Sequence, residues 1–367
     1  MRNKTVHIIG SRGYPSFYGG FETLVRHLAP FLSDRGWDVT VFGRTPTDPA
    51  EITTGDPRVR AKHTMGLETK SLSTLTYGFT STVASARERP DAALVLNVAN
   101  GYWLPLLAAR GVPTLVNVDG MEWKREKWNK LAKAVFLGGA KLTARWADAL
   151  VYDSRALGDQ WAKMFLREGT FIPYGASGVP QMQPPLDLPS SGYILYVARF
   201  VPENTVVEFL QAAENLSNDY QVVIVGSSGY GGEIEELARS LSERKERVTW
   251  LGHLSNDDLL FALWKNAGVY YHGHSVGGTN PALVQAMALG SPTVARDTAY
   301  NREVLAETGI YADPTADDIE SKIRSLMQKP DLRREKSRSA EDRARAEYTW
   351  NRICADYESA LIEIIGT

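Results

Sequence analysis

The sequence predicts an α/β protein with two doubly wound parallel sheets. Short apolar runs alternate with amphipathic helical patterns along nearly the whole chain, and strands separated by helices pair in parallel through crossovers. A chain of 367 residues is long enough to bury two cores. The alternation is interrupted once, by five prolines among glycines and serines at residues 173–192, a composition typical of a linker. Two similar units joined there suggest a ligand cleft between them.

The first half of the chain predicts five strands with helices between them. In residues 20–36, apolar side chains recur at helical spacing from Phe21 to Leu32. We expect a first domain over residues 1–175 and a linker over residues 176–192. The expected strands are 6–10, 39–43, 92–97, 114–118 and 149–152, and the expected helices are 20–36, 71–89, 124–146 and 155–166.

The same alternation restarts after the linker and predicts a second domain over residues 193–345. Its last part, residues 329–345, is heavily charged and typical of a solvated helix. The final segment, residues 346–367, carries an apolar helical face that can pack on either domain. The expected strands are 193–198, 221–226, 248–251, 268–271 and 292–295.

Composition excludes several classes of function. The net charge of -2 argues against nucleic-acid binding, which needs a clear basic excess. Cys354 is the only cysteine, so no internal disulfide forms and a reducing compartment fits. The first apolar run is too short for a signal peptide, and no run reaches the ~18 to 20 residues of a membrane span. We expect a cytoplasmic protein that is soluble or attached to a membrane only at its surface.

Residues 272–295 contain the most informative loop of the chain. The glycine pair Gly277 and Gly278 precedes Thr279 and Asn280, and Pro281 follows. Such a loop presents backbone N–H groups at a helix N-terminus, where a phosphate or diphosphate is favoured. We expect Asn280 to cap a helix over residues 281–289. One turn further, Gln285 can reach the same ligand; the alternative is a tight turn without a ligand.

The first strand is followed by another glycine-rich loop, residues 10–20. Its spacing differs from the dinucleotide fingerprint, and the second strand ends in Gly43 and Arg44 without an acidic residue. NAD binding is therefore not expected. The pair Gly19 and Gly20 opens the helix and can admit a phosphate or a sugar close to the backbone. The alternative is an ordinary turn.

Asp119 directly follows a buried strand, so its carboxylate is expected at the carboxyl edge of the sheet. There it can orient an acceptor hydroxyl or act as a base; the alternative is an Asx-turn. After it, basic residues stand among tryptophans, which suits anionic head groups or a pyrophosphate-linked lipid. A solvated helix with core aromatics is the alternative. The residues assigned to an acceptor-facing or membrane-facing surface are Trp123, Lys124, Arg125 and Lys127.

Two loops of the second half follow strands as well. Arg199 comes after the strand at residues 193–198 and is a fixed cation suited to a diphosphate; the alternative is a surface salt bridge. Residues 226–232 are glycine-rich and can cradle a nucleotide, although loops of this composition are common.

The motifs together resemble a known family. IIGSRGYPSFYGGFETLV, VDGMEWKR, VARFVPEN, HGHSVGGTNP and YNREVL are similar, in this order, to motifs of the GT-B glycosyltransferases of family 4. Within that family they look like the bacterial rhamnosyltransferase branch of polysaccharide biosynthesis. The resemblance covers essentially the whole chain. It implies two Rossmann-like domains facing a cleft, with the C-terminal helix returning to the first domain.

The resemblance also implies an activity. It is the metal-independent, retaining transfer of a sugar, L-rhamnose from dTDP-β-L-rhamnose, to a polyprenyl-diphosphate-linked saccharide at the inner face of the plasma membrane. Arg199 would neutralise the leaving diphosphate, and Asp119 would contact the acceptor or the sugar. The residues that the resemblance implies for donor binding are Gly19, Gly20, Arg199, Asn204, Gly277, Gly278, Thr279, Asn280 and Gln285.

The sequence departs from the family pattern at three of these positions. The broad family carries two glutamates where Gly277 and Gln285 stand, and a basic residue where Asn204 stands. Gly277 fits a 6-deoxy sugar with one hydroxyl fewer to hold. A neutral Gln285 accepts hydrogen bonds without charge assistance. Three alternatives therefore remain open: a catalytically weak or inactive nucleotide-sugar-binding protein, a transferase of another hexose from a UDP or GDP donor, and an epimerase.

Overall fold

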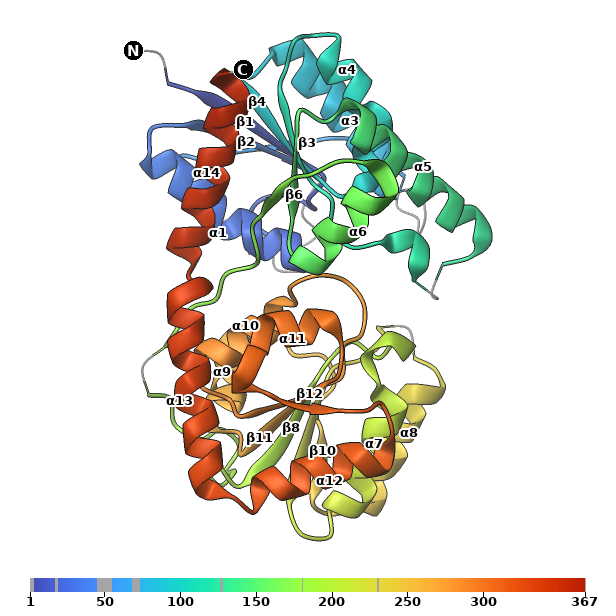
Figure 1. Cartoon of the computed structure of the whole chain (residues 1–367), viewed down its shortest axis with the longest axis vertical. Coiled ribbons are helices and arrows are strands. Elements are labelled where there is room, and N and C mark those ends of the chain that lie inside the picture. Colours follow the sequence, from blue (N-terminus) through green and yellow to red (C-terminus); the bar gives the residue numbers. More distant parts are fainter. Residues whose placement is uncertain are drawn as a thin grey trace. The chain divides into compact units, whose positions relative to one another are not determined.

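The chain forms two compact α/β units, as the computed structural model shows (Figure 1). The structure describes residues 3–16, 19–44, 55–67, 73–125, 128–179, 181–229 and 231–366. The first unit comprises Met1–Tyr174 with Trp350–Thr367, and the second comprises Gly175–Thr349. The segment 176–192 therefore groups with the second unit, and the last helix groups with the first. The predicted fold class, two parallel-sheet α/β domains, is confirmed.

The first unit is built on a seven-stranded parallel sheet with the order β3-β2-β1-β4-β5-β6-β7. Every predicted strand is present, with its ends within one residue of the expected ones. Two strands were not expected: β3 is polar and largely exposed, and β7 has only two residues. The strands are β1 Thr5–Ile9, β2 Asp38–Gly43, β3 Arg60–His63, β4 Ala92–Leu96, β5 Thr114–Asn117, β6 Ala149–Tyr152 and β7 Thr170–Phe171.

Helices connect these strands, and one helix prediction was wrong at its start. The helix expected over residues 124–146 begins at Lys130, because the Asn129 side chain accepts a hydrogen bond from the Ala132 N–H and caps it there. The helices of this unit are α1 Gly20–Asp34, α3 Ser73–Glu88, α4 Leu104–Ala108, α5 Lys130–Trp146, α6 Arg155–Phe165 and α14 Trp350–Gly366, with 3-10 turns η1 Val98–Trp103 and η2 Glu122–Lys124.

The C-terminal helix α14 packs on the first unit and runs alongside α1 (Figure 1). Its Tyr357 hydroxyl accepts a hydrogen bond from the Asn117 Nδ2 atom at 2.6 Å, at the end of β5. The Trp350 ring stacks on His27 of α1, with ring centroids 4.1 Å apart. The expected return of the last helix to the first domain is therefore confirmed.

The second unit contains a six-stranded parallel sheet with the order β10-β9-β8-β11-β12-β13. Only β13 was not expected. The strands are β8 Tyr193–Val197, β9 Gln221–Val225, β10 Val248–Trp250, β11 Val269–His272, β12 Thr293–Arg296 and β13 Ile310–Ala312. The helices are α7 Val206–Leu216, α8 Glu233–Arg244, α9 Asp257–Asn266, α10 Pro281–Ala288, α11 Ala299–Leu305, α12 Ala316–Met327 and α13 Pro330–Glu347, with 3-10 turns η3 Pro202–Asn204 and η4 Ala306–Thr308.

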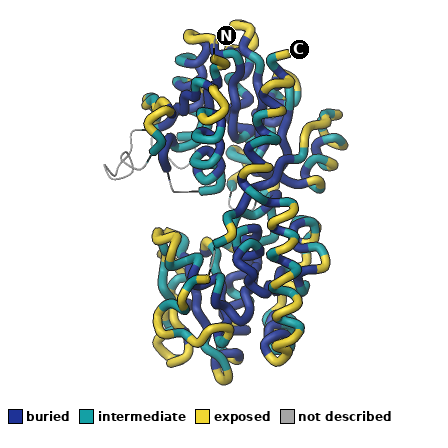
Figure 2. Tube along the Cα trace, turned by 90° about the vertical axis from the view of Figure 1, so that its left-hand side faces the viewer, coloured by how far each residue is buried: buried dark blue, intermediate teal, exposed yellow. Residues whose placement is uncertain are grey.

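In each unit the buried segments lie in the interior and the exposed segments at the surface (Figure 2). The central strands are almost fully buried, as their apolar sequences require. The helices bury one face each and leave the other face exposed, which is the amphipathic pattern read from the sequence. Among the described residues, no helix is long and apolar enough to cross a membrane.

Candidate functional site

Each sheet reverses its strand order at one point, and ligands of doubly wound sheets bind at the carboxyl ends of the strands beside such a point. In the first unit the reversal lies at β1, between β2 and β4; in the second it lies at β8, between β9 and β11. The loops that the sequence singled out follow β1, β5, β8, β9 and β11. The site residues therefore gather at the carboxyl edge of each sheet.

Arg199 follows β8 at this reversal point, and its side chain is exposed. Its guanidinium forms no ion pair and no side-chain hydrogen bond within the part of the chain that the structure describes. The main chain around it is held firmly, because its carbonyl accepts hydrogen bonds from the Val201 N–H at 2.9 Å and from Asn204 Nδ2 at 2.8 Å. Arg199 is therefore an available cation on a fixed support.

Asn204, which holds the main chain of Arg199 in place, is buried. Besides its bond to the Arg199 carbonyl, its Oδ1 atom lies 2.6 Å from the His274 Nδ1 atom. Its own carbonyl accepts a hydrogen bond from the Tyr196 hydroxyl at 2.7 Å. Asn204 thus joins the loop after β8 to the loop after β11, and both groups of its amide are engaged within the protein.

The loop after β11 leads into α10 as the sequence predicts. The Asn280 side chain accepts a hydrogen bond from the Ala282 N–H at 2.9 Å, and Pro281 is the first helical residue. The predicted cap and helix start are confirmed. Gly277 has a φ of 105°, which side chains rarely adopt. Gly278 and Thr279, between Gly277 and Asn280, are buried.

Gln285 lies one turn into α10, and its amide pairs with the main chain of Ser177. Nε2 donates to the Ser177 carbonyl at 2.7 Å, and Oε1 accepts from the Ser177 N–H at 3.2 Å. An amide has two N–H groups and two acceptor lone pairs. The pairing with Ser177 uses one N–H group and one acceptor lone pair of the amide. Gln285 therefore fixes the segment around Ser177 and retains one donor and one acceptor site for a ligand.

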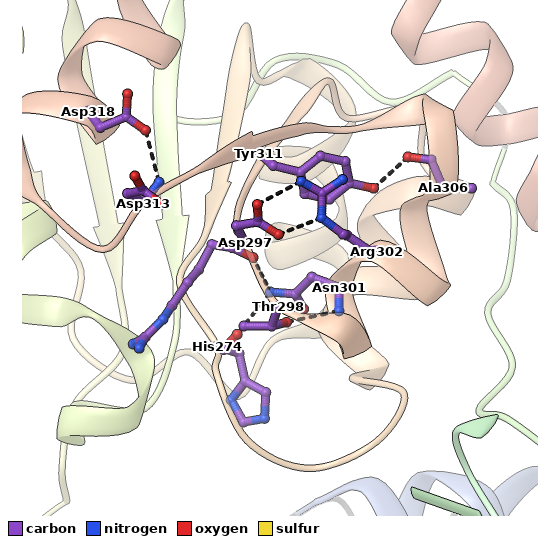
Figure 3. Close-up of polar contacts among 10 residues, drawn as sticks. His274, Asp297, Thr298, Asn301, Arg302, Ala306, Tyr311, Asp313 and Asp318 are labelled. Carbon is purple, nitrogen blue, oxygen red and sulfur yellow. Dashed lines mark hydrogen bonds and ion pairs between the residues drawn. The ribbon is translucent and has the colours of Figure 1, made fainter. Parts of the chain in front are cut away.

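The loop after β12 completes this edge (Figure 3). The Asn301 Nδ2 atom donates to the carbonyls of His274 and Arg296, at 2.9 and 2.8 Å. Asp297 forms a two-point ion pair with Arg302, whose guanidinium holds the pKa of that carboxyl below its usual value. These contacts fix the loop that carries His274 against β12.

A histidine that the sequence did not single out, His272, ends β11. It is 3% exposed, and its Nδ1 atom lies 2.8 Å from the Tyr270 hydroxyl. Its Nε2 atom has no hydrogen-bond partner among the described residues. Burial lowers the pKa of His272 well below its usual value, and nearby His274 lowers it further. The ring is therefore neutral at physiological pH.

The glycine-rich loop at residues 226–232 already holds an anion of the protein itself. The Glu235 carboxylate accepts hydrogen bonds from the Ser228 N–H at 2.6 Å and from the Ser228 hydroxyl at 2.8 Å. These bonds lower the pKa of Glu235 below its usual value. The Ser228 N–H and hydroxyl of this loop are thus engaged by Glu235 within the protein.

In the first unit, Gly19 and Gly20 begin α1. The Gly19 carbonyl accepts a hydrogen bond from the Thr23 N–H at 2.9 Å. A Cβ atom added at Gly19 would lie 3.0 Å from the Glu22 Oε2 atom. Glu22 is buried, and its Oε1 atom accepts a hydrogen bond from the Arg12 N–H at 2.9 Å. A side chain at Gly19 would therefore come close to the Glu22 carboxylate.

Asp119 lies at the carboxyl end of β5, in the left-handed backbone region with a φ of 59°. Its N–H donates to Asn117 Oδ1, and its Oδ2 accepts from Asn97 Nδ2 at 3.0 Å. Asn97 ends β4 and also has a positive φ, of 72°. Non-glycine residues in this region cluster at functional sites. Asp119 thus has the edge position that the sequence predicts, and the Asx-type contact next to it is made by the Asn117 side chain.

The basic segment after Asp119 is arranged differently from a helix start. The Trp123 ring packs against Trp161 and Phe165 at the unit's core. Arg125 pairs with the buried Glu122 at 2.6 Å. Lys124 is exposed and donates to Gln160 at 2.9 Å. Of the four predicted surface residues, only Lys124 presents a charge to solvent in the described chain, and Lys127 lies outside the described residues.

Sequence reasoning missed several residues that line the two edges. Asn97, Asp153 and Thr205 each follow a buried strand or its first turn, and this position is the signal that could have found them. Asn301 comes from a helix and carried no such signal. No group of three or more His, Cys, Asp or Glu side chains that could hold a metal ion occurs in the described ranges.

Comparison with protein families defines the class of this protein. Residues 19–175 match the family described as glycosyl transferase 4-like domain, and residues 183–343 match glycosyl transferases group 1. The two matched segments together make up most of the chain. The protein is therefore a glycosyltransferase of the GT-B type, with a 4-like domain followed by a group 1 domain.

One curated relative is the O-antigen chain mannosyltransferase B of Escherichia coli. It is 28% identical over 145 residues, which cover 37% of this chain and 37% of that protein. This chain thus spans well under half the length of the relative that it matches. The match leaves the sugar, the acceptor and the stereochemistry to be inferred.

Solved structures confirm the fold. A sucrose-phosphate synthase from Thermosynechococcus elongatus superposes with a TM-score of 0.83 at 19% identity, covering 99% of this chain and 100% of that one. Anabaena Alr3699/HepE in complex with UDP gives 0.75 at 15% identity, covering 98% and 100%. A putative UDP-N-acetylglucosamine 2-epimerase from Listeria monocytogenes gives 0.69 at 14%, covering 99% and 98%. At these identities the likeness concerns the fold alone.

Proposed function

We propose that the protein is a retaining glycosyltransferase that moves L-rhamnose from dTDP-β-L-rhamnose to a saccharide acceptor. The observation that carries the proposal is Arg199, an exposed cation without a partner among the described residues, at the strand-order reversal of the second sheet. A fixed cation at this place suits a diphosphate. The complexes of Alr3699/HepE with UDP and UDP-glucose support a nucleotide-sugar donor for this fold.

We base the identity of the transferred sugar on the loop before α10. Gly277 offers no side chain where the broader family presents a carboxylate, so one sugar hydroxyl fewer is held, as in a 6-deoxy sugar. D-mannose is the second candidate, because the curated relative is named a mannosyltransferase. L-rhamnose is 6-deoxy-L-mannose, so the two sugars share a ring configuration in mirror-image form and differ by one hydroxyl.

The proposed chemistry uses charge placement and no metal ion. As the glycosidic bond breaks, negative charge grows on the leaving diphosphate, and Arg199 neutralises it. The N-terminus of α10, with Gly278, Thr279 and Asn280, offers backbone N–H groups to the same anion. Asp119 is held by Asn97 and accepts a hydrogen bond from a sugar hydroxyl. A donor phosphate oxygen takes the acceptor proton on the same face, which retains the configuration.

The acceptor is proposed to be a polyprenyl-diphosphate-linked saccharide at the cytoplasmic membrane face. Lys124 is exposed, and α5 begins with exposed Lys130 and with Leu131, which is 74% exposed. Cations beside exposed apolar side chains suit an anionic membrane surface. A nucleotide-sugar-binding protein without turnover is the remaining candidate, because Asn204 and Gln285 are both engaged with the protein.

The test combines donor binding with turnover. Thermal unfolding is followed with dTDP-rhamnose, GDP-mannose, UDP-glucose and UDP-GlcNAc, and transfer to a synthetic lipid-diphosphate sugar is then measured. A donor at ~100 times its Kd stabilises by about 2.7 kcal/mol. We expect a shift and product with dTDP-rhamnose. A shift and product only with GDP-mannose would replace rhamnose by mannose, and a shift without product from any donor would favour the binding protein.

Arg199→Ala isolates the residue that carries the proposal. We expect kcat to fall by about 100-fold or more, as for loss of a preorganised charge contact, with an unchanged Tm. Arg239→Ala is the matched control, because it removes the same charge from an exposed arginine of α8 that pairs with Glu236. Normal turnover in Arg199→Ala would contradict the assignment.

A further inference from the structure

Tyr174 is the last residue of the first unit, and the function proposed above leaves it without a role. It is only 7% exposed. Its hydroxyl forms no hydrogen bond with any residue in the described ranges. A tyrosine hydroxyl that is fully buried normally has a partner, but the Tyr174 hydroxyl is not among the fully buried polar atoms that lack one. It is therefore accessible to solvent or to a ligand.

Strand register brings Tyr174 to the same edge as two carboxylates. β5 pairs with β6 so that Asn117 lies beside Val151, which sets Asp119 level with Asp153. β6 pairs with β7 so that Tyr152 lies beside Phe171, and Tyr174 follows just beyond the end of β7. The carboxyl ends of three neighbouring strands thus present Asp119, Asp153 and Tyr174 in order along the sheet.

The phenol of Tyr174 lies close enough to carboxylates for their charges to act on it. Burial raises the pKa of Tyr174 well above its usual value, and the charges of Asp119, Asp153 and Glu22 raise it further. The hydroxyl is therefore protonated at physiological pH and can donate a hydrogen bond. Asp119 is already oriented by Asn97 at 3.0 Å, so a fixed acceptor and an available donor lie along one edge.

The negative charges at this edge determine which chemical class of ligand can bind there. The carboxylates of Asp119 and Asp153 repel a diphosphate, so the edge does not suit the nucleotide or the lipid diphosphate. A neutral molecule rich in hydroxyl groups can donate to the carboxylates and accept from the phenol. A sugar ring has that chemistry. Within a glycosyltransferase two sources exist, the ring being transferred and the terminal ring of the acceptor.

We propose that Tyr174 is a sugar-binding residue, whose hydroxyl donates a hydrogen bond to an oxygen of a neutral sugar ring that also donates to Asp119. The proposal rests on the proposed glycosyl transfer. In this proposal the sugar ring binds at the carboxyl edge of β5, β6 and β7, and the diphosphate binds to the second unit.

The first test needs no turnover. Saturation-transfer NMR with methyl α-L-rhamnoside and methyl α-D-mannoside reports ring binding to the full chain. We expect a signal from the wild type that Tyr174→Phe weakens by about 10-fold, the loss of one hydrogen bond to a fixed site. Tyr152→Phe is the control, because its hydroxyl donates to the Arg167 carbonyl at 3.0 Å and serves the fold. Equal signals from wild type and Tyr174→Phe would overturn the proposal even if transfer occurs.

The second test is kinetic and separates the two sources. In Tyr174→Phe we expect kcat/KM to fall about 10-fold with an unchanged Tm. If the acceptor KM rises while slow hydrolysis of the donor by water is unchanged, the ring belongs to the acceptor. If hydrolysis falls as well, the ring is the one transferred. Wild-type kinetics in Tyr174→Phe would contradict the proposal. Failure of the wild type to transfer any sugar would sink the proposed function, and the NMR result would still decide for Tyr174.

Discussion

At the scale of single residues, the second unit uses amides where an enzyme of this class was expected to offer charge. Asn204 links the Arg199 carbonyl to His274, and Gln285 pairs with both main-chain groups of Ser177. Neither role needs a charge, and each needs a donor and an acceptor in one side chain. The departures from the family pattern are therefore consistent with a structural use of these positions.

Gln285→Glu is expected to lower stability. A glutamate cannot donate to the Ser177 carbonyl, and its carboxylate would face that oxygen at the position where Nε2 now lies 2.7 Å away. Leaving a partly buried acceptor unpaired costs about 1 to 3 kcal/mol, to be measured by urea unfolding of the second unit.

The matched control is Gln328→Glu, because Gln328 is an exposed amide beyond the end of α12. A stability of Gln285→Glu equal to that of the wild type would show that the Ser177 contact is dispensable. In that case a gain in donor affinity would support the donor-binding role that the resemblance implies for this position.

At the scale of elements, periodicity predicted most strands and helices because buried parallel strands and amphipathic helices leave strong patterns. The exceptions have physical reasons. β3 is a polar edge strand, β7 is two residues long, and both are defined by pairing with a neighbour. The start of α5 was misplaced because the basic residues before Asn129 are also good helix formers, whereas the Asn129 side chain decides the boundary.

As with the strands and helices, the sequence predicted part of the candidate site. A polar residue directly after a buried strand is visible in a sequence, which is why Asp119 and Arg199 were named. The partner that holds each residue comes from another strand or helix. Asn301 and Ser177 therefore appear as partners only once the chain is folded.

The corrected start of α5 moves the expected membrane contact onto that helix. Lys130–Trp146 contains no acidic residue, and Lys130, Lys141 and Arg145 are exposed at spacings that share one helical face. Each cation near an anionic surface contributes about 1 kcal/mol. We expect the double variant Lys130→Glu with Lys141→Glu to lose cosedimentation with vesicles containing phosphatidylglycerol.

Two controls separate this from general effects of charge. Lys329→Glu with Arg338→Glu changes the net charge equally on exposed positions of the second unit and should still cosediment. Arg125→Glu should instead destabilise the first unit, because it places two acids together where Arg125 now pairs with Glu122. Unchanged cosedimentation of the α5 variant would remove the membrane proposal.

At the scale of the whole molecule, both units contain histidines that are held neutral by burial. In the first unit, burial lowers the pKa of His7 and of His27 to about 4. His7 lies 2.9 Å from the Ser85 hydroxyl, and His27 stacks on Trp350 of α14. In the second unit His272 is lowered in the same way. Acidification therefore acts on both folded units with the same sign.

We predict that the first unit loses stability as pH falls from about 6.5 to about 4. Between these values the unfolded chain binds protons at His7 and His27 and the folded chain does not, so the free energy of unfolding decreases with each step down in pH. Above pH 6.5 both states are neutral at these residues, and below pH 4 both are charged. Each histidine contributes a slope of up to about 1.4 kcal/mol per pH unit inside the window.

Urea unfolding at pH 7.5, 6.0 and 5.0 measures the slope. Carboxylates also titrate as the pH falls, so the decisive quantity is the difference between wild type and variant. His27→Gln removes one titrating ring and should flatten the profile by about that histidine's share, whereas His253→Gln, at an exposed position of the second unit, provides the comparison. If the profile of His27→Gln runs parallel to that of the wild type, His27 binds protons in the folded protein as it does in the unfolded chain. The ring that stacks on Trp350 of the last helix would then be charged at low pH.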